Sequence, residues 1–342
     1  MPVVGRSELY RHLRCIRLLD ERLVQLQRQG RVGFHGSCAG QEVAPVAAGL
    51  ALRPSDWIFP ALRESYVMLV RGFPLELYLA QDFGSAADIG KGRQMPSHQS
   101  ARSVNVVSWS SCIATQLPQA VGMAMAARKR GSSDIALAFL GDGATSHPDF
   151  HAALNFAGVF RAPCVFVCQN NQFAISLPVE RQSNNAQLFE KAFAYGIPGE
   201  RVDGNDAEVV LAAFERAAAR ARDGDGPSFI ECLTYRVGPH SSSDDPTRYR
   251  DEAVTRSWQE RDPIALVRAR LLEEGALDDA GDAALTRELT AELDAAIAAA
   301  AAVPPPARSS LFDDVYARRP RHLQEQAELL AATQPAEPPG PK

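Results

Sequence analysis

The middle of the chain alternates between two patterns of hydrophobic and polar residues. Residues 134–143 and 163–171 are short apolar runs that end in glycine or asparagine, which is typical of strands buried on both faces of a parallel sheet. Residues 115–131 and 148–160 have apolar side chains at helical spacing, and the second of these runs begins with a proline, which the first helical turn tolerates. The order of the four runs predicts parallel strands joined by a helical crossover.

Helical patterns also flank this region. An amphipathic helix is expected over Glu8–Arg28, with Gly30 as its C-terminal cap, and the alanine-rich segment Asp278–Ala302 is expected to be helical as well. Residues 209–224 and 228–238 add a third helix and a third strand. The whole pattern predicts an α/β fold, with a doubly wound, mainly parallel sheet and helical extensions at the N- and C-terminal ends.

Proline-rich segments suggest where the units of the chain end. We expect one large domain over residues 1–302, which includes the N-terminal helix, because a run of prolines follows it. A C-terminal extension is expected over residues 303–333. Residues 334–342 are polar and rich in proline, so we expect a disordered tail there.

Composition narrows the class of protein. With 342 residues, of which 46% are hydrophobic, the chain can form a large core. The net charge of -5 argues against a nucleic-acid partner, and no apolar run reaches the roughly 18 residues of a membrane span. The six cysteines show neither metal-ligand spacing nor a disulfide pattern. Because the first residues resemble neither a signal peptide nor a transit peptide, we expect a cytoplasmic protein without a membrane partner.

Polar residues follow the two central strands at the point where each strand ends. Gly141, Asp142 and Gly143 follow the first strand, and Asn170 and Asn171 follow the second. Ligands of open α/β sheets bind at the carboxyl ends of the strands. Glycines let backbone N–H groups approach a phosphate, and Mg²⁺ accepts carboxylate and amide oxygens as ligands. The predicted ligand of this edge is therefore a diphosphate bound through magnesium.

The same region resembles a known family. The resemblance lies in the run GDGATSHPDFHAALNFAGVFRAPCVFVCQNNQFAIS, which is similar to the thiamine-diphosphate motif of the alpha subunits of 2-oxo acid dehydrogenases, and it extends over about residues 28–326. It implies an enzyme that uses thiamine diphosphate and Mg²⁺ to decarboxylate a 2-oxo acid oxidatively and to transfer the acyl group to lipoyl. The runs GKGRQMPSH and LFDDVYARRPRHL look most like the branched-chain type, whose substrate is 3-methyl-2-oxobutanoate.

The resemblance assigns roles to individual residues. Asp142 and Asn171 match the side-chain ligands of magnesium, and Phe173 matches its backbone-carbonyl ligand. His240 matches a catalytic histidine that lies at the terminal phosphate and near the reacting centre. The positions that match cofactor contacts are Arg63, Ser111, Ile113, Asp142, Gly143, Ala144, Gln169, Asn171 and His240.

Two further sites and two departures follow from the same resemblance. Phe34 matches a substrate-pocket position, and Leu62 is expected to form another wall of that pocket. Leu62 stands where many relatives have a tyrosine, and Gln169 stands where some have a phosphate-binding arginine, which makes the predicted site less positively charged. The positions that match a potassium site of some members are Ser110, Cys112, Thr115 and Gln116.

The chain shows no second βαβ domain, which in this family carries a glutamate beside the cofactor. The resemblance therefore implies a beta subunit, in an alpha2-beta2 heterotetramer, and a lipoyl-bearing acyltransferase that accepts the acyl group. Two alternatives remain, a pyruvate dehydrogenase alpha subunit and a degenerate, non-catalytic alpha-like subunit. A nicotinamide-binding oxidoreductase is disfavoured, because no G-x-G-x-x-G motif follows the first strand.

Overall fold

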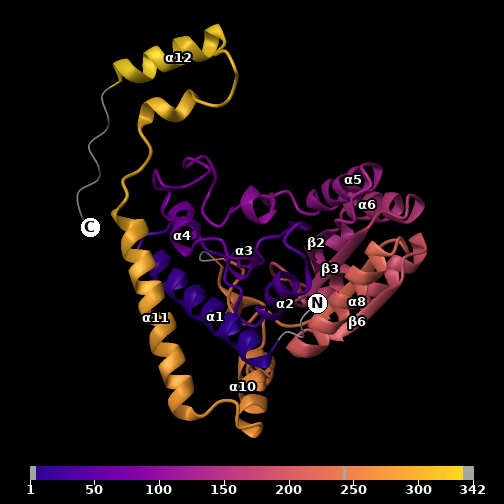
Figure 1. The fold of residues 1–342 in the computed structure, drawn as a ribbon. Coiled ribbons are helices and arrows are strands. Elements are labelled where there is room, and N and C mark those ends of the chain that lie inside the picture. Colours follow the sequence, from indigo (N-terminus) through magenta and orange to yellow (C-terminus); the bar gives the residue numbers. More distant parts are fainter. Residues whose placement is uncertain (1–4, 242–243, 334–342) are drawn as a thin grey trace.

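A parallel sheet forms the centre of the protein (Figure 1). The structure is a computed structural model that describes residues 5–241 and 244–333. Its strands are β1 (Trp57–Phe59), β2 (Ala136–Gly141), β3 (Cys164–Asn170), β4 (Phe173–Ala174), β5 (Leu177–Pro178), β6 (Gly199–Asp203) and β7 (Ser228–Leu233). The main sheet has the order β1-β2-β3-β7-β6, and each neighbouring pair is parallel. Strands β4 and β5 form a separate antiparallel pair.

Helices surround the sheet and extend to both ends of the described chain. The α-helices are α1 (Arg6–Arg28), α2 (Val43–Ala51), α3 (Val67–Val70), α4 (Leu75–Phe83), α5 (Gln116–Lys129), α6 (Pro148–Val159), α7 (Val179–Gln182), α8 (Ala207–Arg222), α9 (Glu252–Gln259), α10 (Pro263–Glu273), α11 (Asp279–Ala302) and α12 (Arg321–Ala332). The 3-10 helices are η1 (Arg102–Val104), η2 (Asp142–Ser146), η3 (Leu188–Tyr195), η4 (Pro246–Arg248) and η5 (Arg308–Phe312).

Alternate side chains of the central strands pack against different helices. Leu137 and Val167 belong to an apolar cluster that includes residues of α1, α2 and α8. Ala138 and Phe166, one position away, belong to a second cluster with α5 and α6. All four side chains are fully buried, so helices cover both faces of β2 and β3. The predicted doubly wound, mainly parallel α/β fold is thereby confirmed, and burial on both faces explains why the strands are continuously apolar.

The outer parts of the sheet differ from the expectation. The sequence pattern does not predict the edge strands β1 and β6, and β7 ends at Leu233 although a strand was expected up to residue 238. Residues 234–238 leave the sheet instead, and the Thr234 N–H donates to the backbone oxygen of Asn170. This departure from the sheet carries Arg236 to the end of β3, where the functional site lies.

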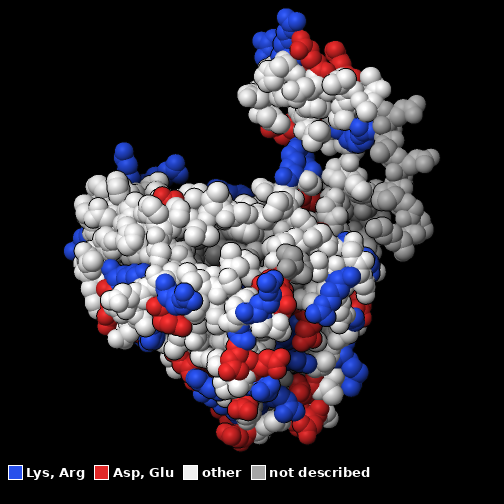
Figure 2. Space-filling view, turned by 180° about the vertical axis from the view of Figure 1, so that it is seen from behind, with Lys and Arg blue, Asp and Glu red and all other residues white. Residues whose placement is uncertain are grey.

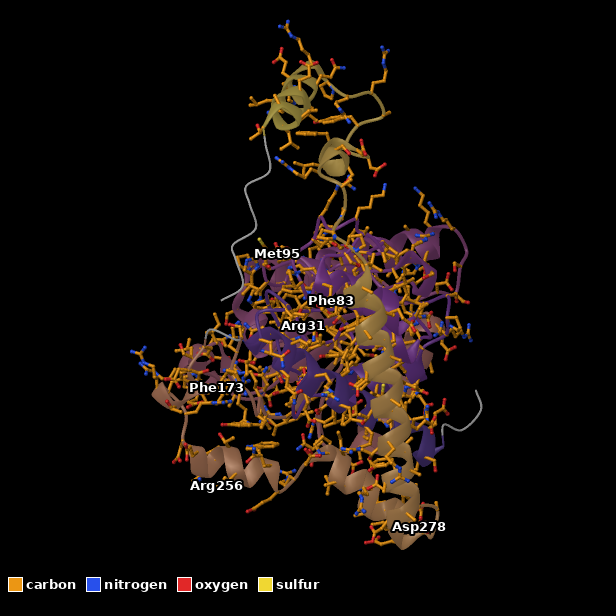
Figure 3. All side chains as sticks on the ribbon, turned by 90° about the vertical axis from the view of Figure 1, so that its left-hand side faces the viewer. Arg31, Phe83, Met95, Phe173, Arg256 and Asp278 are labelled. Carbon is orange, nitrogen blue, oxygen red and sulfur yellow. The ribbon has the colours of Figure 1, made fainter. Side chains whose placement is uncertain are left out.

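Two long helices lie beside the body of the protein. α1 and α11 pack together, and the Tyr10 hydroxyl donates to Asp282 Oδ1 at 2.7 Å. α11 runs lengthwise along one side, and the segment after it stands away from the body with η5 and α12 (Figure 3). The division at residues 302 and 303 stays a prediction, and the tail expected at 334–342 lies outside the described residues. No described helix is long and apolar enough to cross a membrane.

A buried carboxylate ties the loop after α1 to that helix. Asp20 is 2% exposed, and it accepts hydrogen bonds from Ser37 Oγ at 2.6 Å and from the Cys38 N–H at 2.9 Å. The Tyr66 hydroxyl donates to Oδ1 at 3.0 Å, and His35 Nε2 lies 2.9 Å from the same oxygen. Burial raises the pKa of the Asp20 carboxyl, but the contacts with His35, Ser37 and Cys38 lower it by more than burial raises it, so the pKa lies below its usual range. A charged Asp20 therefore fixes this loop.

Tyr66→Phe is expected to lower the free energy of unfolding of the full chain by about 1.5–3 kcal/mol, because a hydrogen bond to a charged acceptor is lost. Tyr78→Phe is a matched control, since Tyr78 is equally buried and stacks on Tyr66 but pairs with the neutral Ser65 hydroxyl at 2.8 Å. Loss of that neutral bond should cost about 0.5–1.5 kcal/mol. Urea titrations of both variants measure the difference, and equal losses would argue against an anionic Asp20.

Candidate functional site

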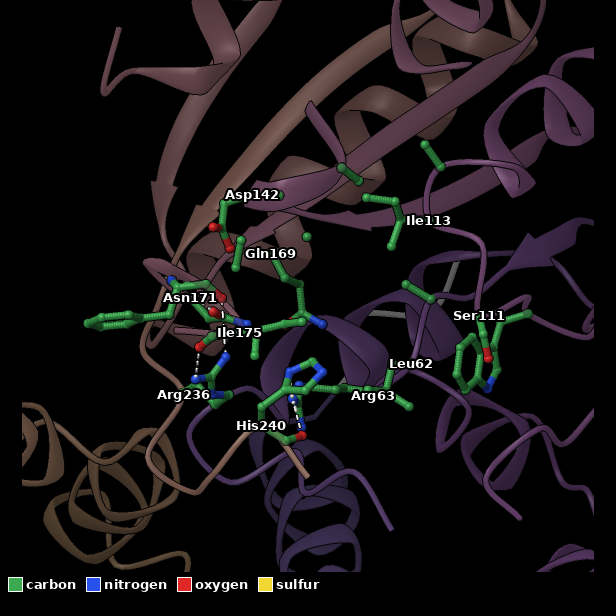
Figure 4. Close-up of a pocket in the computed structure, with 18 of the residues that line it drawn as sticks. Leu62, Arg63, Ser111, Ile113, Asp142, Gln169, Asn171, Ile175, Arg236 and His240 are labelled. Carbon is green, nitrogen blue, oxygen red and sulfur yellow. Dashed lines mark hydrogen bonds between the residues drawn. The ribbon is translucent and has the colours of Figure 1, made fainter. Parts of the chain in front are cut away.

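A cavity of about 500 Å³ opens at the carboxyl ends of β1, β2, β3 and β7 (Figure 4). The cavity therefore lies at the edge of the sheet where the sequence predicts ligand binding, which is also where open α/β sheets bind their ligands. Most of the predicted site residues meet there. Those that line the cavity are Phe34, Leu62, Arg63, Ser110, Ser111, Ile113, Gln116, Asp142, Gly143, Ala144, Gln169, Asn171, Phe173 and His240.

Asp142 directly follows the carboxyl end of β2, and one of its side-chain oxygens has no hydrogen-bond partner among the described residues. It begins η2 directly after β2 and is 1% exposed. Its Oδ2 atom has no hydrogen-bond partner among the described residues. Burial raises the pKa of its carboxyl to about 6. A buried carboxylate oxygen without a partner is costly, and a bound cation is the species that would pair with it.

Gly143 lets the β4–β5 hairpin approach Asp142 closely. A Cβ atom at position 143 would lie 2.8 Å from the Ala174 Cβ atom, which is too close for a real contact. Gln182 closes the same corner, because its Nε2 donates to the backbone oxygen of Asp142 at 3.0 Å. The glycine between Asp142 and Ala144 is therefore required by packing as well as by its expected role beside a phosphate.

Asn171 and Phe173 present oxygen atoms on the neighbouring strand end. Asn171 Oδ1 accepts from the Phe173 N–H at 3.2 Å, and Asn171 Nδ2 donates to Gln41 Oε1 at 2.8 Å. The backbone oxygen of Phe173 accepts from Arg236 Nη1 at 3.2 Å. No three His, Cys, Asp or Glu side chains gather as a metal site in the described ranges. A cation here would thus be held by one carboxylate and by amide and carbonyl oxygens, a set that suits Mg²⁺.

Two buried arginines give the cavity a positive charge. Arg63 is 5% exposed and Arg236 is 1% exposed. Burial, together with the charge of Arg236, lowers the pKa of Arg63 to about 10. Arg236 donates to the backbone oxygen of Ile175 at 2.6 Å, but its Nε atom has no partner within residues 5–241 and 244–333. Buried cations of like charge are stabilised by an anion between them, so the cavity is suited to a phosphate.

His240 lies against Arg63 (Figure 4). Arg63 Nη2 donates to the backbone oxygen of His240 at 2.8 Å and lies 3.4 Å from its Nδ1 atom. Burial, and after it the charges of Arg63 and Arg236, lower the pKa of His240 to about 4. The imidazole is therefore neutral at neutral pH. Because an arginine only donates, Nδ1 is the acceptor and Nε2 carries the proton.

Gln169 is already engaged by a neighbouring carboxyl. Its Nε2 atom donates to Glu64 Oε1, and the other oxygen of Glu64 accepts from the N–H groups of Ala61 and Arg63. Burial raises the pKa of the Glu64 carboxyl above its usual range. Gln169 therefore holds the start of the Arg63 segment, and its expected contact with the cofactor stays a prediction.

A turn between η1 and α5 forms another wall. His98 Nδ1 lies 3.0 Å from the backbone oxygen of Pro96, so this nitrogen carries the proton and Nε2 accepts from Ser111 Oγ at 3.3 Å. The His98 ring stacks on Trp109 with its centroid 3.9 Å away. Ile113 is 54% exposed at the rim of the cavity. The position of Ser111 is thus supported by a stacked histidine that was not expected from the sequence.

The predicted potassium residues lie in the same turn but do not all face the cavity. Cys112 is exposed, its N–H donates to Ser110 Oγ at 3.2 Å, and its oxygen accepts from Thr115 Oγ1 at 2.8 Å. Cys112 and Thr115 are not among the residues that line the cavity. Gln116 points toward the sheet and donates to the Phe139 oxygen at 2.7 Å. Potassium binding at these residues stays a prediction.

Phe34 and Leu62 bring apolar surface to the cavity. Leu62 packs over Gly36, where an added Cβ atom would lie 3.1 Å from the Leu62 side chain. A larger residue at position 36 would therefore displace Leu62. Both predicted substrate residues line the cavity, and Leu62 lies in the segment that follows β1.

Comparison with protein families decides the class of this site. Residues 10–309 match the model of the family described as dehydrogenase E1 component. The chain belongs to the dehydrogenase E1 component family. The resemblance inferred from the sequence is confirmed, and membership of this family implies thiamine diphosphate as the cofactor and, for an alpha subunit, a beta subunit as partner.

Relatives within this family cover nearly the whole chain. The 3-methyl-2-oxobutanoate dehydrogenase subunit alpha of Mycobacterium tuberculosis (strain ATCC 25618 / H37Rv) is 42% identical over 329 residues, or 95% of this chain and 86% of that protein. The mitochondrial 2-oxoisovalerate dehydrogenase subunit alpha of Homo sapiens is 38% identical over 332 residues, which are 97% of this chain and 75% of that protein. The mitochondrial 2-oxoisovalerate dehydrogenase subunit alpha 2 of Arabidopsis thaliana is 40% identical over 327 residues, which are 95% of this chain and 69% of that protein.

The side chains of this E1 chain fit the cofactor of its family. Buried polar atoms of cavity-lining residues that lack a hydrogen-bond partner in the described part of the chain are two acceptors, Asp142 Oδ2 and Gln182 Oε1, and two donors, Gln41 Nε2 and Arg236 Nε. The carboxylate oxygen of Asp142 can pair with a metal ion, and the two donors can pair with the oxygens of a diphosphate. Together they match a metal–diphosphate group.

Besides His98, the E1 residues that line this cavity and were not expected from the sequence include Gln41, Gln182 and Arg236. For Arg236 a signal existed, because it is a basic residue just beyond the last apolar run and four residues before His240. Gln41 and Gln182 are uncharged and lie in unremarkable segments, so only the fold brings them to the site.

Proposed function

We propose that this chain is the alpha subunit of a branched-chain 2-oxo acid dehydrogenase, which decarboxylates 3-methyl-2-oxobutanoate oxidatively and transfers the acyl group to lipoyl. The observation that carries the proposal is the buried Oδ2 atom of Asp142, which has no hydrogen-bond partner in the described part of the chain, in a cavity that Arg63, Asn171 and Arg236 also line. The names of relatives that share about 40% of their residues with the chain over most of its length support the same reaction.

In this proposal the cavity binds Mg²⁺ and the diphosphate of thiamine diphosphate. Asp142, Asn171 and the backbone oxygen of Phe173 supply hard oxygen ligands, and Arg63 and Arg236 offset the charge of the phosphates. The bound cofactor supplies a carbon nucleophile and an electron sink for the loss of carbon dioxide. Potassium at the turn of residues 110–116 would brace the adjoining wall.

His240 is the proposed proton carrier of this chain. The neutral imidazole accepts at Nδ1 from Arg63 and keeps a proton at Nε2, so it can donate a hydrogen bond to an oxygen of the reactants in the cavity. Arg63 fixes the ring on one side, and burial together with the charge of Arg63 lowers the pKa of His240, which holds the ring in the neutral form. His240 would therefore position and donate a proton rather than act as a cation.

The cavity rim supports an assembly in which a second subunit covers it. Met95, Ile113, Ile175 and Leu177 line the cavity and are 58%, 54%, 56% and 40% exposed. Charged side chains gather on the lower part of the face in Figure 2, and the upper part of the body shows few. We propose an alpha2-beta2 heterotetramer that works with a lipoyl acyltransferase. The cytoplasmic location stays a prediction, which fractionation of the source cells would test.

The assembled enzyme should prefer 3-methyl-2-oxobutanoate or 4-methyl-2-oxopentanoate to pyruvate by at least about tenfold in kcat/KM. The reason is that a branched side chain fills the apolar pocket beside Phe34 and Leu62, whereas the methyl group of pyruvate leaves part of it empty. Decarboxylation assays of the co-expressed alpha and beta subunits, with and without thiamine diphosphate, measure this preference. Leu62→Tyr should narrow the gap by shrinking the pocket and adding a hydroxyl, whereas the apolar Leu62→Met should preserve it.

Two alternatives are outcomes of the same experiment. If pyruvate is used as efficiently as the branched acids, the chain is a pyruvate dehydrogenase alpha subunit. A degenerate alpha-like subunit, which Leu62 and Gln169 would suggest, would assemble with the beta subunit but bind no thiamine diphosphate. Calorimetric titration of the assembled protein with magnesium and thiamine diphosphate distinguishes that case.

A further inference from the structure

Gln41 lies beside the predicted metal ligands although it is far from them in sequence. It precedes α2, is 2% exposed and lines the cavity. Gly40 makes this approach possible, since its φ angle is 85° and a Cβ atom there would lie 2.5 Å from the backbone oxygen of Tyr235. The turn thereby presses Gln41 against Asn171, which is 130 residues further along the chain.

The contacts fix which way each amide points. The Phe173 N–H can only donate, so the atom of Asn171 that faces it must be Oδ1. Asn171 Nδ2 then faces Gln41 and requires an acceptor, which is Gln41 Oε1 at 2.8 Å. A flipped Asn171 amide would bring two donors together at Phe173. The Phe173 N–H and Asn171 therefore fix which amide atom of Gln41 faces Asn171. The Gln41 Oε1 acceptor in turn holds the Asn171 amide in place.

This arrangement leaves the Gln41 amide nitrogen without a partner. Nε2 is buried, and no described residue accepts a hydrogen bond from it. Asp142 Oδ2, an acceptor at the same cavity that also lacks a partner among the described residues, does not pair with it. A buried amide donor without an acceptor costs about 1–3 kcal/mol. An anionic oxygen that enters the cavity would remove this cost.

We propose that Gln41 is a positioning and binding residue for the metal–diphosphate group: its Oε1 holds the Asn171 amide so that Oδ1 serves the metal, and its Nε2 donates to a diphosphate oxygen. The inference rests on the proposed function, because it presumes that the cavity takes magnesium and a diphosphate. Asn171 Oδ1 has two lone pairs, of which the Phe173 N–H uses one and the metal would use the other.

Two substitutions separate the two roles of Gln41. Gln41→Met removes both the acceptor and the donor at similar volume, so it should weaken binding of thiamine diphosphate and of Mg²⁺ by about 10–100-fold, the usual cost of losing a group that orients a metal ligand. Gln41→Glu keeps an acceptor for Asn171 but loses the donor and adds a negative charge. It should weaken thiamine-diphosphate binding and leave the Mg²⁺ requirement within about threefold of wild type.

The measurements are calorimetric titrations of the assembled alpha and beta subunits with thiamine diphosphate at saturating Mg²⁺, and with Mg²⁺ at saturating thiamine diphosphate. Gln99→Met is a matched control, because Gln99 is as buried as Gln41, donates to Asp82 Oδ2 at 3.0 Å and does not line this cavity. It should lower the melting temperature of the apo-protein without changing either affinity.

The outcomes are distinct. If wild type binds no thiamine diphosphate, the proposed function fails. If wild type binds it and Gln41→Met binds both ligands within about threefold of wild type, the inference about Gln41 is wrong. It is wrong as well if Gln41→Glu raises the Mg²⁺ requirement as much as Gln41→Met does, because the acceptor for Asn171 would then have no effect.

Discussion

Asp142→Asn is expected to weaken binding of magnesium and thiamine diphosphate to the assembled enzyme by at least about 100-fold, because losing even a group that orients a metal ligand costs 10–100-fold and Asp142 is the proposed ligand itself. It is the one carboxylate in the proposed set of Asp142, Asn171 and the Phe173 oxygen. Asparagine has the same shape, so the cavity should keep its form while the charge that balances the cation is lost. Isothermal titration calorimetry measures the change.

The same variant should not weaken the fold. In the apo-protein, Asp142 is a buried carboxylate, and one of its oxygens has no partner among residues 5–241 and 244–333. A neutral side chain of the same size removes the cost of that buried charge. The apo-variant should therefore melt no lower than wild type in a thermal scan. Asp149→Asn, in the first turn of α6 and not at the cavity, is a control that should leave cofactor affinity unchanged. Unchanged binding by Asp142→Asn would show that the metal site lies elsewhere.

The central part of the fold was predictable because burial on both faces leaves a clear trace in the sequence. β2 is apolar up to Leu140 and β3 up to Cys168, and the proline at the start of α6 limits where that helix begins. The edge strands leave no such trace. β6 contains Glu200, Arg201 and Asp203, and β1 has only three residues, so pairing with their neighbours rather than hydrophobic pattern makes them strands.

The candidate site was predictable where it lies at strand ends. Asp142 and Asn171 follow adjacent apolar runs, and the parallel register between β2 and β3 brings the ends of these runs together. Gln41 could not be found in this way, since a turn at Gly40 and not a strand brings it to the site. The low pKa of His240 likewise depends on its burial and on the charges of Arg63 and Arg236, and only the fold brings these about.

The chain without its beta subunit is expected to decarboxylate 2-oxo acids at least about 100-fold more slowly than the assembled enzyme. This factor is the lower end of the rate acceleration that a general acid or base typically contributes. The carboxylates that line the cavity among the described residues are Asp142 and Glu64. Asp142 is assigned to the metal. Glu64 accepts from Gln169 and from two backbone N–H groups, so neither carboxylate is free to activate the cofactor by proton transfer.

Reconstitution tests this expectation. Release of carbon dioxide from 3-methyl-2-oxobutanoate, with an artificial electron acceptor, should be near the background for each separately purified subunit and should appear when the two are mixed. A mixture of the Asp142→Asn chain with the beta subunit should assemble to the same size and remain inactive, which separates assembly from cofactor binding. If mass spectrometry shows no beta subunit and the chain alone turns over at the rate of the mixture, a base within this chain must serve, and Glu64, the remaining carboxylate at the cavity, would be the first residue to replace.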